Sequence, residues 1–160
     1  MILVEGESDR AAVEVCARRL GAGRVEAVAM AGITNLRAHL RTATGPVRLL
    51  HDAAEAGYVA RVLGASPGLS VEAYVCHADL EDELIRAVGV PGVLAVVDAQ
   101  GERTSYERMA QQPAQRDRTD HARLRRWLGA RSGHKLTYAT LLAEAVPIDD
   151  VPAPLRAVLA

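Results

Sequence analysis

With 160 residues, 49% of them hydrophobic and 24% charged, the chain has the size and composition of one globular domain, which excludes a disordered protein. The formal net charge of −1 excludes binding to polyanions through bulk charge, although a local basic patch stays open. No apolar run reaches the roughly 18 residues of a membrane span, and the first residues lack the basic region of a signal peptide. We therefore expect a cytoplasmic protein with no membrane partner.

Short apolar runs alternate with helical patterns through the first half of the chain. The runs at residues 2–4, 25–30, 47–52 and 71–79 are typical of strands. Between them, residues 8–20, 33–43 and 53–64 have helical spacing, and Ser8 is the expected cap of the first helix. Strands and helices in alternation, joined by short loops, predict an α/β domain with a largely parallel, Rossmann-like sheet.

The second half has no strand pattern. Residues 80–100 are expected to be mostly helical with a new turn at Pro91, and the chain from Ser105 onward is expected to be wholly helical. We therefore divide the chain into an α/β core over residues 1–104 and a helical extension over 105–160, packed on the same domain. Because the chain has no Phe, the core must use Ala, Val, Leu and Ile, and Cys16 and Cys76 are expected to be reduced core residues.

Basic residues gather in the helical extension. Residues 103–135 hold nine Lys or Arg against three acids. Such a stretch is often a solvated surface, but beside an acidic centre it favours a track for a phosphate backbone. The spacing of Trp127 and the tyrosines favours a place in the helical core over stacking on bases.

Acidic residues follow three of the four predicted strands. Glu5, Glu7 and Asp9 follow the first strand, Asp52 and Glu55 the third, and a run beginning at Asp79 the fourth. A single acid at such a place is often only a helix cap, and this alternative stays open for Asp9 and Asp79. Carboxylates gathered at one sheet edge repel one another unless a cation lies between them, which favours Mg²⁺ or Mn²⁺ with oxygen ligands.

These residues resemble a known family. A strand ending in "VEGESD", with an acid at the end of a later strand, resembles a TOPRIM domain. The segments "LLHDAAEAGYVARVL", "YVCHADLEDELIRAVG" and "RSGHKLTYATLLAE" resemble the TOPRIM half of the OLD (overcoming lysogenization defect) nucleases, over roughly residues 1–159. The resemblance implies the TOPRIM fold and a metal-dependent endonuclease that cleaves DNA phosphodiesters with two divalent cations, Mg²⁺ or Mn²⁺.

The resemblance also implies roles for individual residues. Glu5 and Lys135 would be catalytic, Lys135 beside the scissile phosphate. The expected metal ligands are Glu5, Asp9, Asp52, Glu55, Asp79 and Glu81. The residues expected to contact DNA are Arg116, Arg118, Arg123, Arg126, Arg131 and His134.

Two departures from the family pattern bear on these roles. Most TOPRIM domains carry Asp-x-Asp on the third strand, whereas this chain has Asp52-Ala-Ala-Glu55, in which the second acid comes one position later. The OLD nucleases have an ATPase domain ahead of the TOPRIM half, and no Gly-x-x-x-x-Gly-Lys-Ser/Thr motif occurs here. A separate ATPase subunit is therefore an open partner.

Other functions stay open from the sequence. The domain could be a module that binds nucleic acid or an ATPase without turnover, with the acids holding a structural cation. It could also be a small TOPRIM nuclease acting on structured RNA, or a phosphotransfer enzyme acting on a small nucleotide. A homodimer also stays open.

Overall fold

Four short strands form one parallel sheet in the order β2-β1-β3-β4. The computed structural model describes residues 1–66, 68–130 and 133–160. The strands are β1 (Ile2–Val4), β2 (Ala27–Ala29), β3 (Val47–His51) and β4 (Val71–Val75). The predicted α/β class with a parallel sheet is confirmed, and three of the strands are shorter than the sequence pattern predicted.

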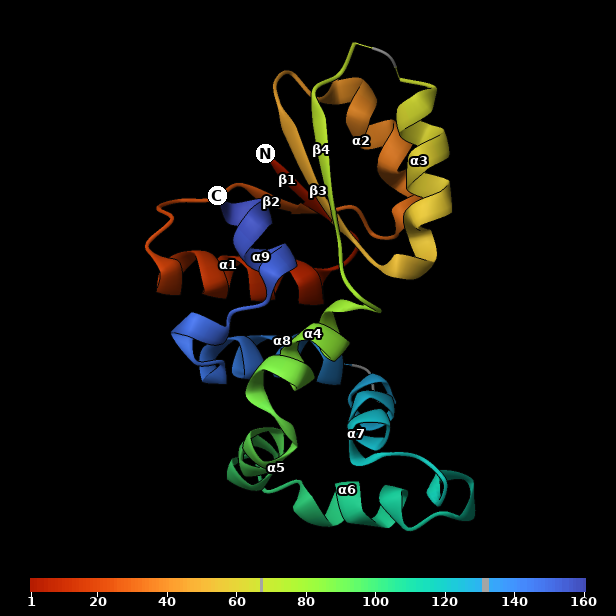
Figure 1. Ribbon diagram of the computed structural model, residues 1–160, viewed down its shortest axis with the longest axis vertical. Coiled ribbons are helices and arrows are strands. Elements are labelled where there is room, and N and C mark those ends of the chain that lie inside the picture. Colours follow the sequence, from red (N-terminus) through yellow and green to blue (C-terminus); the bar gives the residue numbers. More distant parts are fainter. Residues whose placement is uncertain (67, 131–132) are drawn as a thin grey trace.

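Three helices that follow the first strands cover the two faces of the sheet: α1 (Glu7–Leu20), α2 (Leu36–Thr42) and α3 (Ala56–Gly64). Successive strand side chains point to opposite faces. Leu3 and Leu49 therefore pack with α2 and α3, while Ile2, Val4 and Leu50 pack with α1. Figure 1 shows α2 and α3 on one side of the sheet and α1 on the other.

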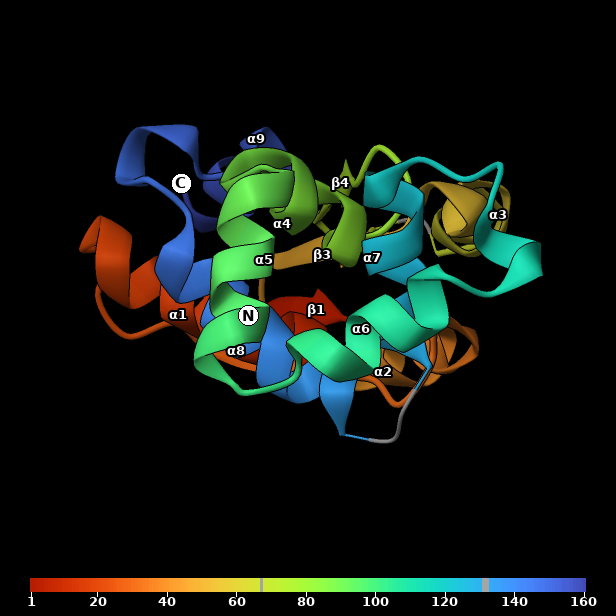
Figure 2. The same ribbon diagram turned by 90° about the horizontal axis from the view of Figure 1, so that it is seen from below.

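The second half of the chain lies beyond the carboxyl ends of the strands (Figure 1). It comprises α4 (Leu80–Val88), α5 (Val90–Ala99), α6 (Arg103–Ala110), α7 (Asp120–Gly129) and α8 (His134–Ala145). Seen from that end, α5 and α6 lie in front of the sheet (Figure 2). The last helix, α9 (Ala153–Leu159), returns to the sheet, where Arg48 of β3 donates a 3.3 Å hydrogen bond to the carbonyl of Val158.

The helical character of residues 105–160 is as predicted, since the described part of this segment contains no strand. The boundary at residue 104 falls inside α6. Between α4 and α5 the chain turns at Gly89, which has a φ of 75°, and Pro91 lies in the first turn of α5, where a missing backbone N–H is tolerated. No helix in the described ranges is long and apolar enough to cross a membrane.

The first helix begins differently from the prediction. Gly6, and not Ser8, is the residue that precedes α1, and Ser8 lies within the first turn. The carboxylate of Asp9 accepts a 2.8 Å hydrogen bond from the Gly6 N–H, which ties the end of β1 to the start of α1.

Aromatic residues join the helices of the second half. Trp127 is 2% exposed, and its ring centroid lies 5.9 Å from that of Tyr106 and 5.3 Å from that of Tyr138. All three belong to the core that also contains Val4 of β1, as predicted for an aromatic cluster that fills the helical part. Cys16 is likewise buried and has a free thiol, as does Cys76.

Candidate functional site

At the ends of β1 and β3, the chain leaves the sheet toward opposite faces. The two strands are neighbours, but α1 covers one face and α3 the other. In an open parallel sheet, ligands bind in the crevice outside the strand ends at such a point. Glu5 follows β1 and Asp52 follows β3, so the sheet topology places both at this crevice.

The loop after β4 is tied to the same place. The N–H of Ala53 donates a 3.0 Å hydrogen bond to the carbonyl of Ala78. β4 ends at Val75, so the prediction of a strand through residue 79 is wrong at its end. Asp79 is instead the cap of α4, where its Oδ1 accepts a 2.8 Å hydrogen bond from the N–H of Asp82.

Carboxylates from the three loops influence one another's ionisation. The pKa of Asp52 is raised from its ordinary value of 3.8 to about 7 by burial and by the charges of Asp9, Asp79, Glu5 and Glu81. The pKa of Asp9 is raised to about 6, first by burial and then by the charges of Glu81 and Glu5, while the Gly6 N–H opposes the shift. Loops distant in the sequence thus bring five of the six predicted metal ligands into one electrostatically coupled group.

The sixth predicted ligand, Glu55, is less closely coupled. It lies at the end of a 3-10 turn (Ala53–Glu55) and is not among the carboxylates that chiefly raise the pKa of Asp52. The extra residue between Asp52 and Glu55, compared with an Asp-x-Asp motif, places this acid at the start of α3.

Two basic side chains from the helical part contact two of the acids. Nζ of Lys135, at the start of α8, lies 3.2 Å from Oε1 of Glu81. Burial lowers the pKa of Lys135, but the charges of Glu81, Asp79 and Asp9 outweigh it and the pKa is raised. The acids therefore keep the ammonium group charged beside them.

Arg125 of α7 forms the second contact. Its Nε lies 2.8 Å from Oδ2 of Asp79, and its Nη2 contacts the same oxygen. Sequence reasoning counted Arg125 within the basic stretch but did not select it, because the contact spans 46 residues and depends on how α7 docks against α4.

A small polar hollow opens at this contact. Its volume is about 280 Å³. It combines two acids of the coupled group with four basic side chains. The lining residues are Asp79, Glu81, Arg118, Ala122, Arg125, Arg126 and Lys135.

Other residues predicted to contact nucleic acid have different surroundings. Arg123 donates 2.9 Å hydrogen bonds to the carbonyls of Gln115 and Arg116 and is paired with Asp120, so its guanidinium holds the turn before α7. Arg116 is exposed, outside the residues that line the hollow. Arg131 lies outside the described residues.

His134 is buried away from solvent. Its ring lies 4.8 Å from that of Trp127 between centroids, and its Nε2 lies 2.9 Å from Oε2 of Glu102. This position gives His134 a place in the aromatic core, where it does not face a phosphate on the surface.

The acids that follow Glu81 on α4 are held in a separate ion-pair network. Asp82 contacts Nε2 of His121 at 2.7 Å and Nη2 of Arg86 at 3.0 Å, and the pKa of Asp82 is lowered because these partners outweigh its burial. Glu83 pairs with Arg86 at 2.9 Å and accepts a 2.7 Å hydrogen bond from the backbone N–H of His77. This network fixes α4 against the β4 loop and against α7.

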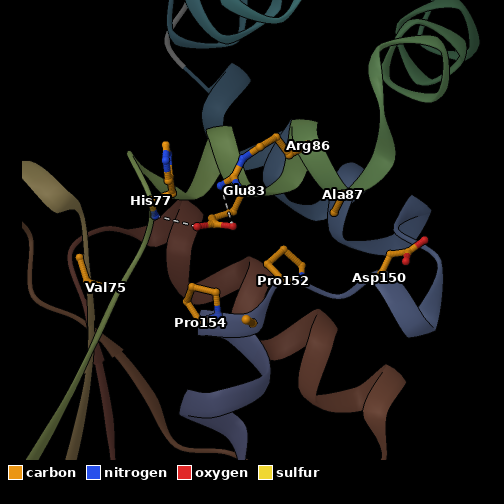
Figure 3. A pocket seen from close by; sticks show the side chains of 9 residues that line it. Val75, His77, Glu83, Arg86, Ala87, Asp150, Pro152 and Pro154 are labelled. Atoms are coloured by element: carbon orange, nitrogen blue, oxygen red, sulfur yellow. Dashed lines mark hydrogen bonds and ion pairs between the residues drawn. The ribbon is translucent and has the colours of Figure 1, made fainter.

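A larger hollow, of about 710 Å³, lies on the other side of α4, between the end of β4 and the start of α9. Figure 3 shows Glu83 and Arg86 on its α4 wall, with Pro152 and Pro154 opposite. It does not contain the coupled acids.

The chemistry of the coupled acids fits a hard divalent cation. All the donors are carboxylate oxygens. The pKa values of Asp9 and Asp52 are raised first by burial and then by neighbouring carboxylates, and a bound cation would favour the ionised form of both. Within the described residues, no group of three or more His, Cys, Asp or Glu side chains is already arranged around one metal position. Metal binding would therefore require the side chains to move, including those of Asp79 and Glu81 out of their ion pairs.

No protein-family model, no curated protein and no solved structure matches this chain.

Proposed function

We propose that this protein is a divalent-metal-dependent nuclease that cleaves DNA phosphodiester bonds. The observation that carries the proposal is the coupled group of acids at the ends of β1 and β3 and the start of α4, beside a hollow lined by basic side chains. Bound cations would stabilise the coupled acids, and metal-assisted phosphoryl chemistry combines such cations with basic side chains that hold the phosphate. The resemblance to the TOPRIM half of the OLD nucleases points to the same chemistry.

In this proposal the chain's own residues have distinct tasks. Glu5, Asp9 and Asp52 would hold one cation, and Asp79 and Glu81 a second. Glu55 would be an additional ligand, in place of the second Asp of the usual motif. When bound, such ions supply Lewis-acid activation of the attacking water and of the leaving oxygen.

Basic residues would hold the substrate. Lys135, already charged beside Glu81, would contact the scissile phosphate and stabilise the charge that develops there. Arg118 and Arg126 would hold the neighbouring backbone. No residue of this set is placed to read base edges, so we expect weak sequence preference.

One observation favours a second candidate, a binding module without turnover. Arg125 and Lys135 neutralise Asp79 and Glu81, as a domain that has lost its metals would require. Such a domain would bind nucleic acid, or a separate ATPase subunit, in EDTA as well as in Mg²⁺.

The test is a plasmid-nicking assay in Mg²⁺, Mn²⁺ or EDTA. We expect metal-dependent nicking by the wild-type chain and its loss in Glu5→Gln, which removes a charge from the coupled group. Glu7→Gln is the matched control, because Glu7 is exposed and its side chain pairs with Arg10 on the surface. Nicking that is equal in the two variants, or absent in every metal, would contradict the proposal.

The same assay distinguishes DNA from RNA. Labelled DNA and structured RNA of equal length are digested side by side. Faster cleavage of RNA would replace the proposed substrate and leave the metal chemistry in place.

A further inference from the structure

Both carboxylate oxygens of Asp79 accept hydrogen bonds, and Oδ2 accepts two. Oδ1 accepts a 2.8 Å hydrogen bond from the N–H of Asp82, and Oδ2 accepts from both Nε and Nη2 of Arg125. An oxygen with two lone pairs that accepts two N–H groups has none left for another partner. Asp79 cannot contact a cation through Oδ2 until Arg125 leaves.

The Lys135 contact with Glu81 is less restrictive. Nζ of Lys135 lies 3.2 Å from Oε1 of Glu81, a longer contact than those of Arg125 with Asp79. A lysine is also a single charge on a flexible stem, whereas an arginine holds a carboxylate through two fixed donors. Arg125 is therefore the stronger competitor for a metal at this site.

The hollow offers Arg125 a second position. Its side chain is 44% exposed, and it lines the hollow together with Arg118 and Arg126. A guanidinium that loses a carboxylate finds an equivalent bidentate partner in a phosphate. A divalent cation near Asp79 would also repel the guanidinium toward such a partner.

We propose that Arg125 occupies the metal-binding carboxylate of Asp79 when no metal is present, and moves to a substrate phosphate when the metal binds. This inference rests on the proposed metal-dependent function and adds a positioning role for Arg125. Metal binding and phosphate binding are then coupled in both directions, because each ligand favours the conformation that the other requires.

The first test measures Mn²⁺ binding to the full chain by calorimetry without DNA. Arg125→Gln is expected to tighten Mn²⁺ binding about fivefold, because the competitor for Asp79 is gone. Arg126→Gln is the matched control, since it removes the same charge from the same hollow but leaves Asp79 occupied; we expect a change of less than about twofold. Arg125→Lys, which keeps the charge with a single-point contact, is expected to fall between them.

The second test measures binding of a labelled DNA oligonucleotide by anisotropy, in Ca²⁺ and in EDTA. The wild-type chain is expected to bind the oligonucleotide more tightly in Ca²⁺, and Arg125→Gln is expected to lose that gain.

Equal Mn²⁺ affinity in the two glutamine variants, or weaker Mn²⁺ binding in Arg125→Gln, would overturn the inference and leave the nuclease proposal standing. A wild-type chain that binds no Mn²⁺ would overturn both.

Discussion

Two groups of acids differ in how their charge is balanced: Glu5, Asp9 and Asp52 near the ends of β1 and β3 (the repelling group), and Asp82 and Glu83 on α4 (the paired group). The pKa values of Asp9 and Asp52 are raised to about 6 and about 7, with burial as the largest cause and neighbouring carboxylates adding to it. On α4, Asp82 and Glu83 have close basic partners, and the pKa of Asp82 is lowered. The paired acids stabilise the fold, whereas the repelling acids cost stability and so require another explanation, such as a ligand.

Removing a charge from the repelling group should give the largest effect, a loss of nicking activity together with a gain in stability. We expect Asp52→Asn to lower metal-dependent nicking by more than about 100-fold, because a proposed metal ligand is lost. At pH 8, above its raised pKa, Asp52 is ionised and destabilising, so the same variant should gain about 1 kcal/mol in EDTA. This figure is well below a full conversion of the pKa shift, because Asp52 is partly exposed to water. Urea unfolding checks it, and a loss of stability would show a structural carboxylate.

Removing a charge from the paired group should lower the stability of the fold, in contrast to Asp52→Asn. Asp82→Asn is expected to lower the free energy of unfolding by about 2 kcal/mol, because Arg86 and His121 lose the charged carboxylate to which both bond. Thermal unfolding in EDTA is the measurement. A variant as stable as the wild type would remove the contrast between the two groups.

A divalent cation should stabilise the chain through the repelling group. At a concentration ten times its Kd, Mn²⁺ is expected to raise the free energy of unfolding by about 1.4 kcal/mol. Glu5→Gln should lose most of this gain and Glu7→Gln should keep it, as followed by the midpoint of thermal unfolding. An equal gain in the two variants would place the cation elsewhere on the chain.

The smallest expected effects come from two arginines of the basic stretch, which should differ in whether they affect DNA binding or stability. Arg118 lines the hollow, whereas Arg123 bonds to backbone carbonyls. Arg118→Gln should weaken DNA binding about threefold and reduce the salt slope by about 0.9, with unchanged stability. Arg123→Gln should lower stability by about 1 kcal/mol with unchanged salt slope. Anisotropy titrations at several salt concentrations, with urea unfolding, distinguish the two.

The elements of the fold could be predicted because their signals are local. The apolar run at Ile2–Val4 stops at an acid and a glycine, and the same alternation of strand and helix recurs through residue 79. Parallel strands deliver their ends to one edge, so the proximity of Glu5 to Asp52 follows from the topology alone.

The partners of the acids could not be predicted in the same way. The pairing of Arg125 with Asp79 depends on how α5 and α6 carry α7 back to α4, which no local pattern records. The burial of His134 depends on the same docking, because Trp127 of α7 is its neighbour. Side chains of one type in one stretch, such as Arg123 and Arg125, therefore have different surroundings that only the tertiary structure distinguishes.

The buried side of α7 gives the chain a built-in spectroscopic reporter. Trp127 is the one tryptophan of the sequence, and it lies on the same helix as Arg125, two residues further along. Its indole packs against the rings of Tyr106, His134 and Tyr138. Any repacking of α7 changes the polarity and the quenching that this indole experiences, so the emission of the unlabelled protein can follow in real time the events at the opposite face of the helix.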